Sequence, residues 1–384
     1  MLDRAVAGQV PPKPHLRARD PAGNQLYEEC LTRSGFEGAY SMLYHQKRPH
    51  EGLPVAPNAT FRAPHSVGAT QLVRRHYRCL ELADGRGAAR VPLLFNAQVT
   101  VGFVRPTSSD SEYFVNADGD ELFYVLRGGG TLRSVFGELG FQAGDYVCVP
   151  KGVLHRFMPS AGEQQAWLWI ETRGGLGLPA HYRNAVGQLR MDAPFSHRDF
   201  RRPELGDPLD EGIRTTLVKR GDELFAFQSR HSPLDVVGWD GSVYPFVLPI
   251  LAFQPRVGQV HLPPPVHATF EAPGVLVCSF VPRPLDFHPE ANPCPYPHSS
   301  VDVDEVLFYA NGSFGSRRGI GEGSLSHHPA GISHGPHPRA YEESPVERHT
   351  EEIAVMLDCA LPLKPTADAL AVEDATYHQS FQAP

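Results

Sequence analysis

Two short blocks of sequence occur twice in this chain, in the same order. Residues 120–128 (DELFYVLRG) match residues 304–312 (DEVLFYANG) at an offset of 184 positions. Residues 140–157 (GFQAGDYVCVPKGVLHRF) match residues 319–336 (GIGEGSLSHHPAGISHGP) at an offset of 179 positions. One match could arise by chance, but two in one order indicate a duplicated unit. The chain is therefore expected to fold into two copies of one structure, and its 384 residues are enough for two separate cores.

Each copy reads as an antiparallel β unit. A run of β-branched and aromatic residues follows two carboxylates, a glycine ends the run, and a later strand ends at Pro-x-Gly-x-x-His. Strands with this spacing can roll into a barrel whose interior receives the glutamate and the last histidine. The arrangement resembles the cupin barrel, so we expect an all-β bicupin with two double-stranded β-helix (jelly-roll) barrels. The first barrel, with an N-terminal extension, is predicted over residues 1–190 and the second over residues 191–384.

A complete set of metal ligands is predicted in the second copy. His298 precedes Glu305 by seven positions, and His334 closes the second block. Two imidazoles and one carboxylate on one face of a metal leave about three positions open, as in the non-haem Fe(II) oxygenases. Zn(II) and Mn(II) are left open, because the spacing does not choose between metals. Asp302 and Asp304 are competing carboxylates, but Asp304 should face away from Glu305 in an alternating strand.

The first copy lacks one of these ligands. Glu121 and His155 correspond to the last two ligands of the second copy. The position of the first ligand falls near Phe114 or Val115, and no histidine lies close enough upstream. We therefore predict that the first barrel is structural and that the second is catalytic.

Bulk composition restricts the partners and the compartment. The net charge is −8, and lysine and arginine form no basic stripe, so nucleic acid is not expected as a partner. No run approaches 18 apolar residues and the opening residues lack a signal-peptide core, so we expect a cytoplasmic protein that does not enter a membrane. The six cysteines are scattered without a C-x-x-C pair, which favours reduced thiols.

Five segments of the chain carry a resemblance to a known family. They are GFEGAYSMLYH (35–45), NADGDELFYVLRGGGTL (116–132), VHLPPPVHATFEAPG (260–274), PYPHSSVDVDEVLFYANG (295–312) and GSLSHHPAGISHGPHP (323–338). In these segments the chain resembles the homogentisate dioxygenases, particularly their shorter bacterial form. The resemblance implies cleavage of the homogentisate ring with Fe(II) and O₂ to give maleylacetoacetate, a step of tyrosine and phenylalanine catabolism. It also implies a homo-oligomer, a trimer or a hexamer.

The same resemblance assigns roles to individual residues. It places the iron ligands on His298, Glu305 and His334. Tyr296 and His328 are implied to contact the aromatic substrate, together with His334. The acid/base histidine falls on His261 in an ungapped match, with His267 as the alternative.

Ser300 and Phe314 stand where the family pattern leads us to expect asparagine and tyrosine. Other functions remain open at this point. One is ring cleavage of another hydroquinone or hydroxybenzoate such as gentisate, and another is ligand binding by a non-catalytic bicupin. A metal-dependent isomerase or decarboxylase is a third, although such barrels usually carry a histidine where Ser300 stands.

Overall fold

The computed structural model describes residues 3–68, 71–85, 87–312, 319–338, 340 and 348–382. Strands make up nearly all of its regular structure, as the sequence predicts. Short helices occur only at junctions in the described residues. They are α2 (Ala367–Ala371) and the 3₁₀ turns η1 (Cys79–Glu81), η2 (Ala180–Tyr182), η3 (His197–Asp199), η4 (Ile250–Ala252), η5 (Pro264–His267) and η7 (Tyr377–Gln382). No helix in these ranges has the length and apolar character that crossing a membrane requires.

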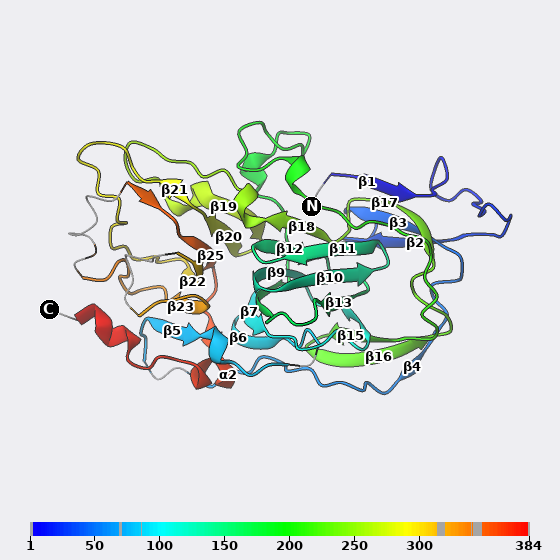
Figure 1. The fold of residues 1–384 in the computed structure, drawn as a ribbon, viewed down its shortest axis with the longest axis horizontal. Helices are drawn as coiled ribbons and strands as arrows, with labels where there is room; N and C mark the ends of the chain where they lie inside the picture. The colour runs from blue at the N-terminus through cyan, green and yellow to red at the C-terminus, as the bar shows by residue number, and fades with distance from the viewer. Residues whose placement is uncertain are drawn as a thin grey trace.

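The first barrel is built from two seven-stranded sheets (Figure 1). One sheet contains, in spatial order, β18 (Phe246–Pro249), β12 (Asp145–Val149), β9 (Asp120–Arg127), β14 (Ala166–Thr172), β7 (Val99–Val104), β6 (Val91–Phe95) and β26 (Lys364–Pro365). The facing sheet contains β11 (Gly137–Gln142), β10 (Gly129–Ser134), β13 (His155–Pro159), β8 (Tyr113–Asn116), β15 (Thr215–Arg220), β16 (Glu223–Ser229) and β4 (Gly52–Val55).

The second barrel has one large sheet of six strands and, among the residues that the structure describes, a much smaller facing layer. The large sheet contains β19 (Ala268–Ala272), β20 (Val275–Phe280), β25 (Ile353–Cys359), β22 (Asp304–Asn311), β23 (Ser324–His328) and β5 (Arg75–Arg78). The described part of the facing layer contains the pair β21 (Arg283–Pro284) and β24 (His349–Thr350), and an isolated bridge between His298 and His334.

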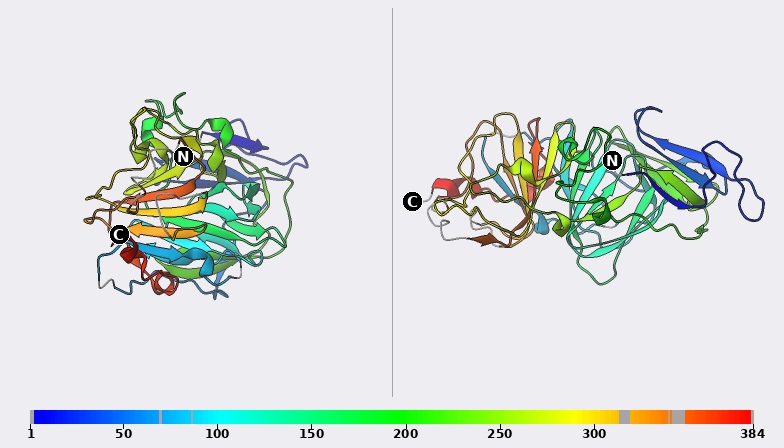
Figure 2. Two further views of the ribbon diagram at one scale, coloured as in Figure 1. Left: turned by 60° about the vertical axis from the view of Figure 1, so that its left-hand side comes forward. Right: turned by 90° about the horizontal axis from the view of Figure 1, so that it is seen from above.

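A separate four-stranded sheet lies at the end of the first barrel, remote from the second barrel (Figure 2). It contains β1 (Ala5–Gly8), β17 (Val236–Gly241), β3 (Tyr40–His45) and β2 (Tyr27–Thr32).

Strand order confirms the duplication that the sequence predicts. In the first barrel the order β12-β9-β14-β7-β6 repeats as β23-β22-β25-β20-β19 in the second. The second strands of the two sets are β9 and β22, which carry the repeated Asp-Glu pair. Glu121 pairs with Glu171 on β14, and Glu305 pairs with Asp358 on β25. The protein is therefore a bicupin, with Glu121 and Glu305 at equivalent places.

The two barrels exchange strands at the same edge. β5, from the first quarter of the chain, pairs with β23 of the second barrel, and Figure 1 shows it among the later strands. β18 takes the equivalent edge beside β12 in the first barrel, and β26 pairs with β6 at the opposite edge of that sheet. Strand pairing thus crosses the expected domain boundary at residue 190 in both directions, and that boundary stays a prediction.

The large sheets of the two barrels pack against each other, which decides where Glu305 points. Phe308 of β22 lies 5.8 Å from Phe103 and 6.2 Å from Tyr124, measured between ring centroids. Because successive side chains of a strand point to opposite faces, Glu305 must point away from the first barrel. Both faces of β9 and most of β22 are buried, so these strands read as nearly continuous apolar runs.

Candidate metal centre

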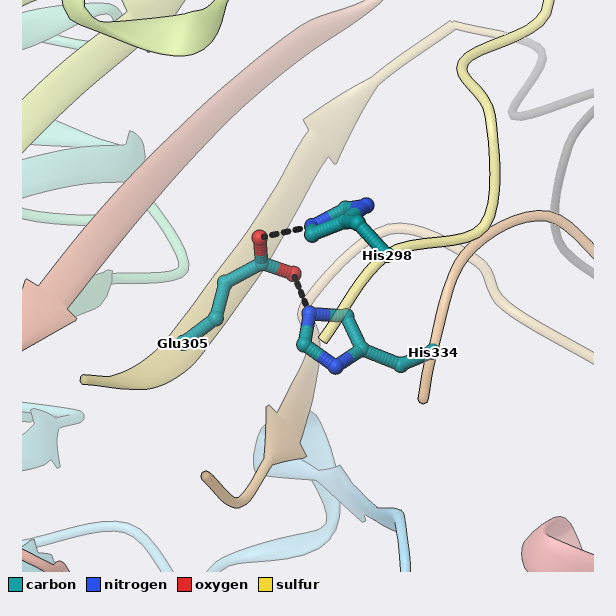
Figure 3. Close-up of side chains that lie close together, drawn as sticks. All are labelled: His298, Glu305 and His334. Carbon is teal, nitrogen blue, oxygen red and sulfur yellow. Dashed lines mark ion pairs between the residues drawn. The ribbon is translucent and has the colours of Figure 1, made fainter. Parts of the chain in front are cut away.

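Three side chains converge inside the second barrel (Figure 3). Glu305 is the second residue of β22, His298 lies on the segment before that strand, and His334 lies on the loop after β23. Their ligand atoms all lie within 4.8 Å of one another. His298 Nε2 lies 3.7 Å from Glu305 Oε2, and His334 Nε2 lies 3.8 Å from Glu305 Oε1. The structure therefore brings together the three residues that the sequence predicts as ligands.

The two histidines are fixed by the backbone as well as by their own rings. The amide of His298 donates to the carbonyl of His334 at 2.8 Å, and the amide of His334 donates back at 2.7 Å. Gly335 follows with φ of 153°, and a Cβ there would lie 2.8 Å from the Cα of Pro297. Only glycine at this position allows the two ligand-bearing segments to approach so closely.

Hydrogen bonds at Nδ1 orient both imidazoles toward the carboxylate. Nδ1 of His298 lies 3.1 Å from the carbonyl of Tyr296, and Nδ1 of His334 lies 3.2 Å from the carbonyl of Ile332. A carbonyl accepts only, so each Nδ1 carries the proton and each Nε2 presents a lone pair. This is the arrangement by which proteins usually prepare a histidine to bind a metal.

The charge on Glu305 is held by the imidazoles around it. Burial alone would raise the pKa of Glu305, but His298, His328 and His334 outweigh burial and hold that pKa well below its usual value. His328 Nδ1 lies 2.7 Å from Glu305 Oε1, and the His328 ring stacks on that of His334 at 4.9 Å. The structure thus places His328 behind the carboxylate, fully buried. Its predicted contact with substrate stays a prediction.

The three donors fit a divalent metal. Ligand atoms bound to one ion at about 2.1 Å lie roughly 3 to 3.6 Å apart, so the observed 3.7 and 3.8 Å need only a small contraction. Nε2 of His334 is buried and has no hydrogen-bond partner in the described part of the chain. A buried imidazole nitrogen that points at a carboxylate without bonding to it has the chemistry of a ligand.

Asp358 is a fourth charged residue at this site, which sequence reasoning missed. It is the cross-strand partner of Glu305 on β25, so the two carboxylates share one face of the sheet. Burial and the charge of Glu305 raise the pKa of Asp358 to about 6, although His298 and His334 oppose the shift. An acidic residue also occupies the matching place in the first barrel, Glu171, and this repetition was the signal in the sequence.

Asp304 is correctly excluded as a ligand by strand alternation. Its carboxylate faces away from the three ligands. It accepts from Nε2 of His327 at 2.9 Å and from the amides of Ala330 and Leu363 at 2.8 Å each. The residue therefore ties the end of β23 to β22, and Asp302 is exposed.

The two candidate acid/base histidines have different surroundings. His261 is half-buried, and its ring meets that of Tyr296 edge-on at 5.3 Å. Tyr296 in turn lies 6.5 Å from the ring of His298. His267 is buried at the end of η5, between Phe253 and Phe280. Burial lowers the pKa of both histidines, and for His267 it does so to about 3.

A guanidinium occupies the equivalent site in the first barrel. Phe114 bridges to His155 as His298 bridges to His334, which identifies Phe114 as the position of the missing ligand. Arg90 donates to both oxygens of Glu121, at 2.6 and 3.0 Å, and its guanidinium lies 4.2 Å from the Phe114 ring. The cation that the carboxylate requires is therefore supplied by the chain itself.

Comparison with known proteins places the chain in a family. The family model "Homogentisate 1,2-dioxygenase N-terminal" matches residues 92–250. The "Putative dioxygenase SSO1533" of Saccharolobus solfataricus is 33% identical over 383 residues, which cover 97% of each protein. The homogentisate 1,2-dioxygenase of Bradyrhizobium diazoefficiens is 28% identical over 274 residues. The chain belongs to the homogentisate 1,2-dioxygenase family.

The match within the family is uneven. The alignment with the Bradyrhizobium homogentisate dioxygenase covers 67% of this chain but only 59% of that enzyme. Among solved structures, a "Cupin 2 conserved barrel domain protein" from Leptotrichia buccalis has 10% sequence identity, covers 76% of this chain and 99% of its own, and gives a TM-score of 0.35. The bicupin architecture rests on the strand pairing described above. Phe314, which the family pattern sets against a tyrosine, lies outside the described residues.

Proposed function

We propose that this protein is an Fe(II)-dependent dioxygenase that converts homogentisate and O₂ to maleylacetoacetate. The observation that carries the proposal is the set His298, Glu305 and His334, with ligand atoms within 4.8 Å, inside the second barrel of a homogentisate dioxygenase family member. Both atoms of O₂ enter the ring-opened product, so the reaction needs no further reductant. Bound Fe(II) would supply a centre where O₂ and a deprotonated hydroquinone can react side by side.

His261 is the residue we assign to the substrate's phenolic proton. Burial lowers the pKa of His261, so its imidazole is neutral near pH 7 and can accept a proton. The ring of Tyr296 contacts both His261 and the ligand His298, so His261 lies close to the metal site. Tyr296 is about half exposed and would form a side of the aromatic pocket. His267, between two phenylalanine rings, has the surroundings of a packing residue, which supports His261 over His267.

His328 holds the ligand carboxylate in this proposal. Its hydrogen bond to Oε1 of Glu305 fixes the rotation of the carboxyl group, and its stacking on His334 fixes that ring. Glu305 therefore presents Oε2 toward His298. Preorganisation of this kind keeps the open positions of the centre on one side, where the substrate and O₂ would bind.

The proposal extends to the setting of the reaction. The product class fits tyrosine and phenylalanine catabolism in the cytoplasm. A small aromatic acid and O₂ are the proposed partners, and a trimer or hexamer of this chain is the proposed assembly.

Oxygen uptake by protein loaded anaerobically with Fe(II) tests the proposal. The substrate panel should contain homogentisate, gentisate and unsubstituted hydroquinone. We expect homogentisate to consume O₂ in equal amount and to give the absorbing ring-opened product. Faster turnover of gentisate would replace the substrate but keep the ring-cleaving chemistry. Tight binding of homogentisate without O₂ uptake would instead indicate a non-catalytic bicupin.

A further inference from the structure

The ring of Phe381 contacts two residues that belong to the surroundings of His334. Phe381 lies in η7, a half-buried turn near the end of the described chain, which Figure 1 shows beside β5. The guanidinium of Arg74 lies over this ring, 4.4 Å from its centroid. The imidazole of His337 stacks on it at 4.0 Å with an interplanar angle of 22°. One side chain thus joins two groups that come from distant parts of the sequence.

Arg74 holds the backbone immediately before the ligand. Its Nε donates to the carbonyl of Ser333 at 3.1 Å, and its Nη2 donates to the same oxygen. The next residue is His334, whose ring orientation depends on the neighbouring carbonyl of Ile332. A shift of the Ser333 carbonyl would therefore turn the peptide that sets the His334 ring.

His337 holds the same loop on the other side of the ligand. It is buried, and its Nε2 lies 2.6 Å from Oγ of Ser380. The Ser380 hydroxyl donates to the carbonyl of Tyr377 at 2.6 Å, so it accepts from His337. The loop from Ser333 to His337 is thus attached to η7 at both ends.

η7 is itself anchored on the sheet that carries Glu305. The chain before it runs along β5, with hydrogen bonds from Arg78 N to Val372 O and from Asp374 N to His76 O, both 2.9 Å. Arg75 adds two hydrogen bonds to the Glu373 carboxylate, at 2.7 and 2.9 Å. β5 pairs with β23, and β23 pairs with β22. A continuous path of contacts therefore connects the strand of Glu305 to the loop of His334.

We propose that Phe381, through Arg74 and His337, positions the loop that carries His334 and so sets the stability of the metal centre. The inference rests on the metal site of the proposed function and adds to it a positioning residue 47 positions after the ligand. Phe381 acts on the ligand loop through its contacts with Arg74 and His337. Its effect is on the rate at which the three ligands release the metal.

The test measures Fe(II) release from loaded protein to a ferrous chelator without O₂. We expect Phe381→Ala and Arg74→Met each to release iron about tenfold faster than wild type, the scale seen when partners of metal ligands are removed. Phe381→Tyr keeps the ring and should release iron at the wild-type rate. Because Arg74 is only partly buried, Arg74→Met should fold even if Phe381→Ala does not.

Val372→Ala is the matched control. Val372 is buried on the same C-terminal segment, where its carbonyl accepts from the amide of Arg78. Its truncation should lower stability while leaving the bonds of Arg74 to Ser333 and of His337 to Ser380 in place. Faster release in Val372→Ala, in proportion to its lost stability, would overturn the positioning role. Wild-type release rates in both Phe381→Ala and Arg74→Met would overturn it as well, while leaving the proposed function intact. A wild-type protein that takes up no Fe(II) would overturn the proposed function and this inference together.

Discussion

Arg90 donates two hydrogen bonds to Glu121 in the first barrel, at the position equivalent to the metal ligands of the second barrel. Both side chains are buried, and Nε1 of Trp169 adds a third hydrogen bond to the carboxylate at 2.9 Å. Burial alone would raise the pKa of Glu121, but the charge of Arg90 outweighs it and lowers that pKa. Of the two equivalent carboxylates, Glu121 is therefore neutralised by a cationic side chain, Arg90. Glu305 is surrounded by imidazoles that can bind a metal cation together with it.

Arg90→Met should destabilise the protein strongly, because it leaves the buried Glu121 carboxylate without its counter-charge. We expect a loss of about 3 to 5 kcal/mol in the free energy of unfolding, measured in urea. The double variant Arg90→Met/Glu121→Leu should recover most of that loss, since no isolated charge then remains. A double variant as unstable as the single one would show that packing, and not charge, dominates the site.

Metal content should depend on the second barrel alone. His298→Ala, Glu305→Ala and His334→Ala should each lose bound iron and ring cleavage while staying folded, because the apolar core is untouched. His155→Ala removes the equivalent of His334 from the first barrel and should keep one iron per chain. Iron analysis after gel filtration decides this, and a His155→Ala protein without iron would reverse the assignment of the two barrels.

Asp358→Asn should stabilise the metal-free protein and lower its affinity for Fe(II). The pKa of Asp358 is about 6 in the fold against an ordinary value near 3.9, so the folded state binds more protons between these values. Stability therefore falls as the pH rises from 4 to 6 and stays lower above it. We expect a gain on the order of 2 to 3 kcal/mol at pH 7 in the variant, and little gain at pH 4.

The same variant removes a negative charge beside the metal, so its Fe(II) affinity should fall about tenfold. Asp302→Asn is the control, because it removes a carboxylate from an exposed position close by. Equal effects of the two substitutions would show that only net charge matters.

His261→Gln and His267→Gln should affect different properties, turnover in the first variant and stability in the second. His261→Gln should keep iron and substrate affinity but slow turnover on the order of 100-fold, the scale of a lost general base. His267→Gln should leave turnover near normal and lower the free energy of unfolding by about 1 to 3 kcal/mol, because it places an amide between Phe253 and Phe280. Slow turnover in His267→Gln alone would exchange the two roles.

The small sheet should lose stability at alkaline pH through His45. Burial alone would lower the pKa of His45, but Asp235 at 2.7 Å and Glu29 at 3.1 Å outweigh it and raise that pKa to about 9. The folded value lies above the unfolded one of 6.5, so the stabilisation is full below pH 6.5 and disappears as the pH rises through 9.

Denaturation at pH 6, 8 and 10 should therefore show a loss on the order of 3 kcal/mol in wild type that is missing in His45→Gln. His15→Gln, which removes an exposed histidine near the same sheet, should behave as wild type. A wild-type curve parallel to that of His45→Gln would show that the imidazole is already neutral at pH 6.

The repeated blocks predict the features that depend on local pattern. The spacing of the Asp-Glu pair and of Pro-x-Gly-x-x-His places Glu305 and His334 on the same barrel, and strand alternation separates Asp304 from Glu305. Features that depend on distant pairing were not predictable in this way. Arg90 reaches Glu121 from outside both repeated blocks, and β5 carries no signal that it pairs with β23.

Asp358 is an intermediate case. Its strand reads as an apolar run with one carboxylate just before its last residue, which alone suggests only the approach of a strand end. The corresponding Glu171 is the last but one residue of the matching strand of the first barrel, where its carboxylate lies 2.8 Å from Nζ of Lys219. Alignment of the two copies through β14 and β25 would have marked this position. The two repeated blocks stop before these strands.

The exchange of β5, β18 and β26 between the barrels has a consequence for synthesis of the chain on the ribosome. β5 leaves the ribosome about 250 residues before its partner β23, and the sheet of the first barrel is complete only when β26 appears. β5 must therefore wait without its partner until the second barrel is synthesised, and the edge of β6 stays unpaired until β26 appears. A ribosome that stalls between these points would leave β5 and the edge of β6 unpaired at the same time.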